Sequence, residues 1–593
     1  MSQRKYRSYE LGKSLNTNFA RWGNSNKTDL WLLFIWFGIG TILRFTNLGY
    51  KPASSIEIAT IGFSLGNGFS QIPLDRLVSI PTLLSPLKVD VSVDSADVIR
   101  RLFSESTHPP LYFWLTHWWI KLFVDHGEIV SLQIARSLSA MFGGLSIPAI
   151  FGLSKLVFSD RLSQKHRLTA HFGAIIMAFS PYGIYLAQEA RHYTLSILWI
   201  IASLSCTISV IKHLRDRRKI PSWIALVWIV INSLGIATHY FFSLALVGEG
   251  LILLGFWFWQ RNQQENKLSF NSWLPVIFAI LGTSIGCLVW LPVASNISGN
   301  ELTDWIATDY DLDEIWEPIP RLLGWLITMV AMLPIEGVPV AIAICSIVVL
   351  LLGSIWMLPT LASSYISWRS SSDCFSFTVI AGYVLGTVSL YLLLIYGYGK
   401  DVSLAARYHF IYFPVIVLIW AAMLAQLWSN FELNQTTGDR PKWFERSPRK
   451  IVAIALIFCF LGSLTVVNDF GYKKSRQANR LARHIQSTTT APAIVATTYE
   501  TLSELRELVA LSLAIENNTA PDETTQPQLL LLQRNENHDA KLNAIMSSQP
   551  KPLDLWGVNL RANEDLLKQV NCIKDDAARL TDSGYKNRVY HCR

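Results

Sequence analysis

The sequence predicts an all-α polytopic membrane protein with a small α/β domain at its C-terminal end. The first observation is composition, since 51% of the 593 residues are hydrophobic and only 16% are charged, whereas about a quarter of the residues in soluble proteins are charged. The second is that the hydrophobic residues form runs of about 20, which cross roughly 30 Å of hydrocarbon as helices. The third is a polar C-terminal segment with strand-like and helix-like patterns. Disorder, a disulfide miniprotein and a coiled coil are excluded.

The hydrophobic runs predict about eleven membrane-spanning helices. The first run follows the polar segment 1–28 and is too long for a signal-peptide core, so we expect it to remain as the first span. The predicted spans are 30–48, 129–158, 171–185, 192–211, 223–238, 241–259, 273–294, 339–358, 375–396, 408–428 and 451–467.

Basic residues set the predicted orientation. Segment 1–28 carries Arg4, Lys5, Arg7, Lys13, Arg21 and Lys27 against the single acid Glu10, which places the N-terminus in the cytoplasm. Basic loops at 161–167, 215–219 and 440–450 are expected on the same side. The apolar stretches 111–124 and 322–333 must then be interfacial or re-entrant helices, because a crossing at either would move the next basic loop outside.

This topology predicts three parts in an inner (plasma) membrane protein. They are a cytoplasmic segment 1–28, a transmembrane domain 29–468 with a long first outer loop 49–128, and an exoplasmic α/β domain 469–593. In the last part, strands are expected at 493–498, 529–532, 553–558 and 589–591 and a helix at 502–515. Cys572 and Cys592 either form a disulfide there or remain thiols. The net charge of +8 belongs to cytoplasmic loops, so the expected partner is the lipid bilayer and not nucleic acid.

Polar residues at the outer ends of the predicted spans are the candidates for function, because hydrocarbon penalises them. They would place carboxylates, imidazoles and guanidiniums on one ring at the bilayer surface. Arginines bind phosphate bidentately, and a carboxylate accepts a proton from a hydroxyl. The alternative is that Arg and Tyr at helix ends only anchor the helices. The clusters are Lys51 to Glu57 with His108; Gln188, Glu189, Arg191, His192 and Tyr193; and His239 and Tyr240 with Arg407 and Tyr408.

The order of these motifs resembles the GT-C class of multi-spanning glycosyltransferases. It is most similar to the bacterial branch that includes protein O-mannosyltransferases and the lipid A aminoarabinose transferase, a glycosyltransferase family 39-like group. The resemblance covers residues 30–428 and implies a polyprenyl-phosphate sugar donor, an envelope acceptor and inversion, with no cofactor required and a divalent cation left open. The motifs are His108-Pro-Pro-Leu-Tyr112, Ala135-Arg-Ser-Leu-Ser-Ala140, Gln188-Glu-Ala-Arg-His-Tyr193, Thr238-His-Tyr-Phe241 and Ala406-Arg-Tyr408.

The resemblance also implies roles for these residues. Arg191 and Arg407 would bind the donor phosphate. The family carries an Asp-Glu pair in the first outer loop, with the Asp as catalytic base, and this sequence has Ile56 and Glu57 there. We therefore expect Glu57 to act as the base. The sugar and acceptor pocket would include His108, Gln188, Glu189, His192, Tyr193, His239, Tyr240 and Tyr408, and the other candidate bases are Asp75, Asp90, Asp94, Asp97, Glu105 and Glu189.

Two other functions stay open. A catalytically impaired homologue would bind lipid-linked sugar without transferring it, which Ile56 favours. A lipid or solute transporter would use the many spans and the intramembrane Glu249, although the pseudo-symmetric repeat of many transporters is not visible. No metal site is predicted, because the acidic loop lacks the glycine and terminal Glu of a calcium loop. Its acids are Asp304, Asp309, Asp311, Asp313 and Glu314.

Overall fold

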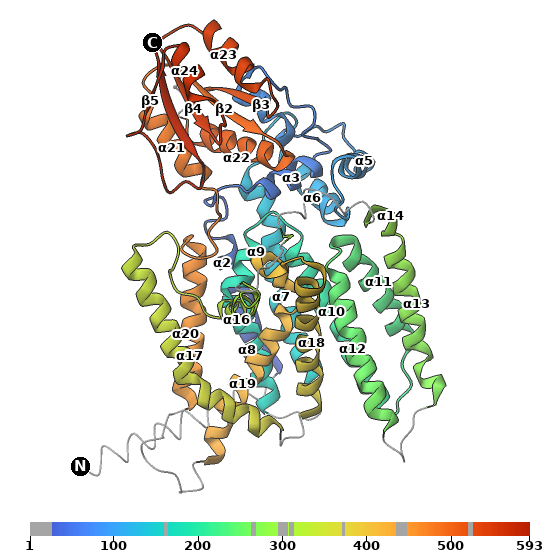
Figure 1. The fold of residues 1–593 in the computed structure, drawn as a ribbon. Helices are drawn as coiled ribbons and strands as arrows, with labels where there is room; N and C mark the ends of the chain where they lie inside the picture. The colour runs from blue at the N-terminus through green and yellow to red at the C-terminus, as the bar shows by residue number, and fades with distance from the viewer. Residues whose placement is uncertain are drawn as a thin grey trace, which may run out of the picture. The chain divides into compact units, whose positions relative to one another are not determined.

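The computed structural model describes residues 26–158, 164–262, 269–294, 306–307, 314–369, 374–434, 448–519 and 526–593. The chain forms two compact units. The helical unit comprises Met1–Thr46, Ser139–Gln188 and His192–Tyr472, and the α/β unit comprises Asn47–Leu138, Glu189–Arg191 and Lys473–Arg593. Figure 1 labels their helices and strands. The basic residues Arg4 to Arg21, parts of the basic loops, and the acids Asp304, Asp309, Asp311 and Asp313 lie outside the described residues.

Each of the eleven predicted spans corresponds to a helix or a helix pair. Among the described residues, eight helices are long and apolar enough to cross a membrane, the bent pair α8–α9 makes a ninth, and two shorter apolar helices, 222–238 and 413–429, match the remaining two spans. The helices are α2 Asn26–Phe45, α7 Leu132–Val157, α8 Gln164–Phe179, α9 Pro181–Ala187, α10 Tyr193–Arg215, α11 Ser222–Thr238, α12 Phe242–Arg261, α13 Leu274–Leu288, α14 Leu291–Ala294, α17 Val340–Arg369, α18 Cys374–Leu392, α19 Phe413–Asn434 and α20 Pro448–Val467.

The bend between α8 and α9 has a local cause. The two helices meet at 53° across Ser180. Pro181 has no N–H and cannot continue α8, while Ser180 Oγ accepts a hydrogen bond from the N–H of Gly183 at 2.9 Å and caps α9. The predicted span 171–185 is therefore a broken helix.

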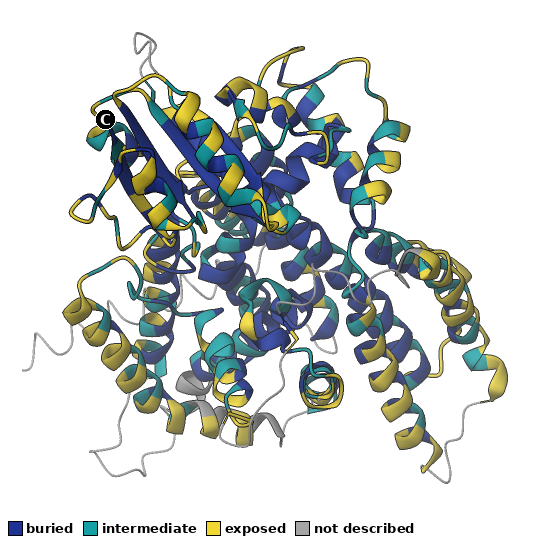
Figure 2. Ribbon diagram, turned by 45° about the horizontal axis from the view of Figure 1, so that its top comes forward, coloured by how far each residue is buried: buried dark blue, intermediate teal, exposed yellow. Residues whose placement is uncertain are grey.

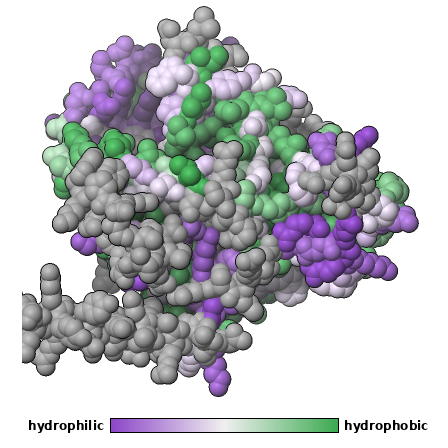
Figure 3. All heavy atoms as spheres, turned by 90° about the horizontal axis from the view of Figure 1, so that it is seen from below, coloured by the Kyte–Doolittle hydropathy of each residue, from purple (hydrophilic) through white to green (hydrophobic). Residues whose placement is uncertain are grey.

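The outer sides of the helical unit are apolar. Figure 2 shows exposed residues along the helices at its rim and buried residues on the sides that face its interior. Leu281 on α13 and Leu352 on α17 are among these exposed apolar residues. The face drawn in Figure 3 carries separate groups of hydrophilic side chains beside hydrophobic ones. Exposed apolar side chains along the outer sides of helices are expected to face lipid and not water.

The two short apolar stretches form short helices, as predicted. They are α6 Leu111–Lys121 and α16 Pro318–Thr328, with 11 residues each. At 1.5 Å per residue, each is about 16 Å long, which is about half of the hydrocarbon thickness.

The α/β unit contains a six-stranded sheet with the order β1-β3-β2-β4-β6-β5. Strand β2 is parallel to β3 and β4, and β6 is antiparallel to β4 and β5. Beyond the four predicted strands, the sheet includes β5 and a short strand from the first outer loop. The strands are β1 Leu77–Val78, β2 Ala493–Tyr499, β3 Gln528–Gln533, β4 Leu553–Val558, β5 Cys572–Asp575 and β6 Asn587–Cys592. The helices are α3 Ser55–Ser64, α4 Ile80–Leu83, α5 Ser95–Glu105, α21 Ala478–Thr488, α22 Leu502–Asn518, α23 His538–Ser548 and α24 Glu564–Gln569.

Residues 49–128, the predicted first outer loop, belong to this unit together with the C-terminal segment. Strand β1 pairs antiparallel with β3, with Leu77 opposite Leu530. Ile61 of α3 and Val509 of α22 belong to one hydrophobic core. The domain prediction grouped the loop with the transmembrane domain 29–468, whereas the compact unit joins it to residues 473–593. The physical reason is that α3 is almost fully buried and its apolar side chains pack against α22.

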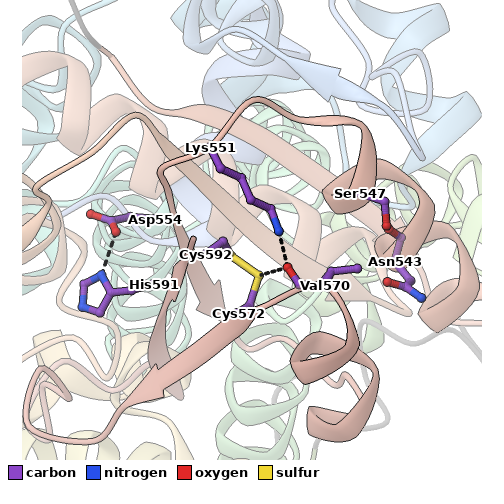
Figure 4. The surroundings of a disulfide bond; sticks show 8 residues. All are labelled: Asn543, Ser547, Lys551, Asp554, Val570, Cys572, His591 and Cys592. Atoms are coloured by element: carbon purple, nitrogen blue, oxygen red, sulfur yellow. Dashed lines mark hydrogen bonds and ion pairs between the residues drawn. A yellow bond between two sulfur atoms is a disulfide. The ribbon is translucent and has the colours of Figure 1, made fainter.

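Cys572 and Cys592 form a disulfide, which resolves the alternative that the sequence left open (Figure 4). The two residues are directly opposite each other on the antiparallel strands β5 and β6. The bond therefore ties the last strand to the edge strand of the sheet.

Candidate functional site

Glu57 lies in the first turn of α3, and the local sequence explains why the helix begins there. Ser54 and Glu57 have the spacing of a capping box, and the backbone N–H of Ser54 donates to Glu57 Oε2 at 3.2 Å. The side chain of Glu57 is therefore directed back toward the helix N-terminus.

Both carboxylate oxygens of Glu57 accept hydrogen bonds inside the α/β unit. Arg136 Nε donates to Oε1 at 2.7 Å and Arg136 Nη2 donates to Oε2 at 3.0 Å. The N–H of Ala190 donates to Oε1 at 3.0 Å, and Lys474 Nζ donates to Oε2. Burial alone would raise the pKa of Glu57, but the charges of Arg136 and Lys474 outweigh burial and hold that pKa well below its usual range.

Arg136 uses all five of its guanidinium N–H groups. Besides the two bonds to Glu57, Nη1 donates to the carbonyls of Leu48 and Lys51 at 2.9 Å each, and Nη2 donates to the carbonyl of Pro52 at 3.0 Å. The Glu57–Arg136 pair therefore determines the conformation at the start of the first outer loop.

Glu189 lies beside this pair and has a different environment. Its Oε1 is 3.7 Å from Lys474 Nζ, the same ammonium that contacts Glu57. Its Oε2 has no hydrogen-bond partner among the described residues, although the residue is only 4% exposed. Glu189 is therefore the carboxylate of this cluster that has one oxygen without a hydrogen-bond donor among the described residues.

Arg191 and His108 are brought into contact in the same unit. Arg191 Nη1 donates to Thr60 Oγ1 at 2.9 Å, and Nη2 donates to His108 Nε2 at 3.2 Å. Because His108 Nε2 accepts, its Nδ1 carries the proton and donates to Ser106 Oγ at 2.9 Å. We call Glu57, His108, Glu189 and Arg191, with their partners Arg136 and Lys474, the outer-loop cluster.

The remaining predicted site residues belong to the helical unit. His239 packs against His192 and Tyr193, with ring centroids 4.3 Å and 6.0 Å apart. The guanidinium of Arg407 lies 5.2 Å from the ring of Tyr408. Phe241 links these contacts, since its ring lies 5.4 Å from that of His239 and 4.9 Å from that of Tyr408. Residues 188–193 contribute to both units, because Glu189–Arg191 belong to the α/β unit and Gln188, His192 and Tyr193 to the helical unit.

Two predicted pocket residues of the helical unit have simpler environments. Gln188 donates to the backbone carbonyl of Thr46 at 2.8 Å, which is a structural contact. Tyr240 is half-buried, and its hydroxyl has no hydrogen-bond partner among the described residues.

The other candidate bases, from residues 49–128, make structural contacts within the α/β unit. Asp75 pairs with Lys541 at 2.6 Å. Asp94 and Asp97 form the capping box of α5. Glu105 accepts from the N–H of Phe69 at 2.9 Å, and Asp90 accepts from the N–H of Ser92 at 2.8 Å.

Sequence reasoning missed two members of the outer-loop cluster. Arg136 stood in a quoted motif but received no role, and the capping-box spacing from Ser54 to Glu57 was a signal that Glu57 begins a helix. Lys474 carried no signal, since it lies 417 positions from Glu57.

No protein-family model and no curated protein matches the chain. Among solved structures, it is similar to ArnT from Cupriavidus metallidurans bound to undecaprenyl phosphate, with 10% identity and a TM-score of 0.48 over 94% of this chain and 97% of that chain. It is also similar to the archaeal oligosaccharyltransferase AglB from Archaeoglobus fulgidus in complex with an inhibitory peptide and a dolichol-phosphate, with 10% identity and a TM-score of 0.43 over 82% of this chain and 63% of that chain.

Proposed function

We propose that this protein is an integral-membrane glycosyltransferase that moves a sugar from a polyprenyl-phosphate donor to an exoplasmic envelope acceptor, with inversion. The observation that carries the proposal is that candidate residues from separate segments of the sequence lie close together. Glu57, His108, Glu189 and Arg191 were predicted from three separate segments, and they lie in one cluster of the α/β unit.

In the proposed reaction, Arg191 donates hydrogen bonds to a phosphate oxygen of the donor. The acceptor hydroxyl oxygen attacks the anomeric carbon, and the bond from that carbon to the phosphate oxygen breaks. The bonding electrons leave with the polyprenyl phosphate, and the charge that develops there is stabilised by the guanidinium. The hydroxyl proton passes to a carboxylate.

We assign that carboxylate to Glu189 and give Glu57 a positioning role. Every acceptor site of Glu57 already faces Arg136, Lys474 or a backbone N–H, and its depressed pKa makes it a poor base. Glu189 Oε2 has no such partner in the described part of the chain. Glu57 would then act through Lys474, which contacts both carboxylates.

Arg407 remains a second phosphate ligand predicted from the sequence resemblance. It belongs to the helical unit, as do His192, Tyr193, His239, Tyr240 and Tyr408, and these residues remain predicted sugar or acceptor contacts.

The test is transfer of labelled sugar by the purified full-length protein in nanodiscs, with a polyprenyl-phosphate sugar and extracted envelope acceptors. We expect transfer, and we expect Arg191→Ala to weaken donor binding and lower the rate about a hundredfold, as loss of a charge-stabilising donor does. Arg100→Ala is the matched control, because Arg100 is exposed and pairs only with Asp97 in the described chain. Absence of both transfer and donor hydrolysis, with unchanged donor binding in Arg191→Ala, would contradict the proposal.

A second candidate function is binding of lipid-linked sugar without transfer. The observation in its favour is that Ile56 occupies the position of the family's catalytic Asp, while the neighbouring Glu57 is fully engaged in ion pairs. In that case, the protein would bind donor and leave it intact.

A further inference from the structure

A cavity of about 990 Å³ lies between α11, α12 and α13 of the helical unit. Its wall is mainly aliphatic and aromatic, with Leu253, Trp257 and Val276 among its residues. Two other wall residues, Leu254 and Ile280, are 49% and 52% exposed. A molecule dissolved in the lipid can therefore reach the cavity without passing through water.

Glu249 of α12 lines this cavity and is only 2% exposed. Its Oε2 faces the hydroxyls of Ser203 at 2.8 Å and Thr207 at 2.5 Å. Its Oε1 has no hydrogen-bond partner among the described residues. Glu249 is the eighth residue of the 20-residue helix α12, or about 10 Å from its start at 1.5 Å per residue, so an open acceptor there is costly unless a ligand or a proton satisfies it.

The polar groups beside Glu249 form a network. Ser203 Oγ lies 2.7 Å from Asn232 Oδ1 and 2.8 Å from Glu249 Oε2, and its single hydrogen is shared between these two acceptors. Asn232 Nδ2 donates to Thr283 Oγ1 at 3.1 Å. Trp228 Nε1 donates to Ser203 Oγ at 3.1 Å. The network therefore orients Glu249 and leaves Oε1 as its open acceptor.

We propose that this cavity binds a lipid-soluble molecule with a long apolar chain and a terminal hydroxyl or ammonium group. The chain packs against the apolar wall, and the O–H or N–H group donates to Glu249 Oε1. The apolar wall selects the chain, and the buried acceptor selects against chains without a donor, because such chains leave Oε1 unpaired. This site uses none of the residues of the outer-loop cluster, so it stands apart from the proposed transferase activity.

Two glycines of α12 give a matched pair of variants. Gly250 lines the cavity and a Cβ added there meets no atom within 4 Å, so Gly250→Leu fills the cavity while Glu249 is kept. Gly255 is on the same helix, is not part of the wall, and also has no atom within 4 Å of an added Cβ. Gly255→Leu is therefore the control for the added side chain.

The experiment is photocrosslinking of the full-length protein in phosphatidylcholine nanodiscs. The probes are diazirine derivatives of hexadecanol, hexadecylamine and hexadecyl methyl ether, and mass spectrometry measures the label on peptides of α12 and α13. We expect the alcohol or the amine to label these peptides at least about tenfold more than the ether, as one buried hydrogen bond allows. Gly250→Leu and Glu249→Leu should remove this difference, and Gly255→Leu should keep it.

Glu249→Gln distinguishes the two donors, because glutamine keeps a carbonyl oxygen and loses the charge. Labelling that is retained in Glu249→Gln identifies a ligand with a hydroxyl group, and labelling that is lost in this variant identifies a ligand with an ammonium group. Equal labelling by all three probes, or labelling that is the same in Gly250→Leu and the wild type, overturns the proposal. The Gly250→Leu result does not depend on the polar network, so it holds even where Glu249→Leu fails to fold.

Discussion

Arg136 Nε lies 2.7 Å from Glu57 Oε1, and both side chains are completely buried. The pair joins the start of α3 to the start of α7, 79 positions apart. Because Arg136 also binds three backbone carbonyls between Leu48 and Pro52, the pair organises the loop that brings Glu57 near Glu189. The geometry of this loop thus depends on a charge pair and not on apolar packing alone.

Removing Arg136 should strongly destabilise the α/β unit. Arg136→Ala leaves the buried carboxylate of Glu57 with only Lys474 as a cation, and breaking a buried pair costs about 3–5 kcal/mol. Thermal unfolding in detergent, monitored by proteolysis of the α/β unit, measures this loss of stability. Arg100→Ala is the control, since its exposed pair with Asp97 contributes about 1 kcal/mol or less. Equal losses of stability in Arg136→Ala and Arg100→Ala would contradict the prediction that the Glu57–Arg136 pair stabilises the α/β unit.

Glu189 and Glu57 should respond differently to neutralisation. Glu189→Gln should lower the rate constant of sugar transfer and leave thermal stability and donor affinity nearly unchanged, because Gln keeps the shape of the proposed base. Glu57→Gln should lower stability, because it leaves the buried Arg136 without its counter-ion. Steady-state kinetics with unfolding curves for both variants separate the roles. A Glu57→Gln protein that is stable but inactive would return the base to Glu57.

Ile56→Asp tests whether the protein is an impaired transferase. Ile56 is the second residue of α3, and a carboxylate in the first turn of a helix stabilises it by about 0.3–1 kcal/mol, so the variant is expected to fold. A gain of at least about tenfold in transfer supports an impaired homologue, and unchanged transfer supports a base already in place. Ile56→Asn is the control for side-chain shape without charge.

The stability of the β4–β6 region should depend on pH. His591 Nδ1 lies 2.7 Å from Asp554 Oδ1 (Figure 4). The hydrogen bond to Asp554 raises the pKa of His591. The stabilisation is thus fully present below the ordinary histidine pKa of about 6.5 and is lost as pH rises through the raised value. Burial would raise the pKa of Asp554, but hydrogen bonds from Thr490 and His591 lower it. The stabilisation contributed by the Asp554 carboxylate is therefore lost only at acid pH.

Hydrogen-exchange protection factors for β4 and β6 amides, measured from pH 5.5 to 8.5, check this dependence. We expect protection to fall toward the alkaline end in the wild type and to stay flat in His591→Gln. A flat profile in the wild type would show that the ion pair does not stabilise the strands.

The disulfide should stabilise the end of the sheet. Cys572 and Cys592 are 20 positions apart, and a loop of that size is stabilised by about 3 kcal/mol in the chain-entropy model. Cys592→Ser should therefore lower the unfolding free energy of the sheet by that order, measured by urea titration with exchange at β5 and β6. Cys345→Ser, which removes an exposed free cysteine, is the control and should cause no change.

Hydrophobic runs and short strand patterns were enough to predict most helices and four strands. These elements are local, because the length of an apolar run and its periodicity decide the backbone structure. β1 and β5 were missed because β1 has two residues and β5, with four, is partly exposed, so neither carries a clear alternation. The sequence predicted which residue types lie at the helix ends of the site, but it did not predict the contacts that Glu57 makes.

The sequence by itself determined that this chain has about eleven apolar helices followed by an α/β segment, because the bilayer requires local runs of apolar residues. Only the tertiary structure decided that the first outer loop and the C-terminal segment share one sheet and one core. It also decided that Glu57 is neutralised by Arg136 and Lys474 while Glu189 keeps an open oxygen. These properties depend on contacts between distant residues, such as Glu57 and Lys474, which are 417 positions apart. Burial and charge pairing at that range leave no local pattern in a sequence.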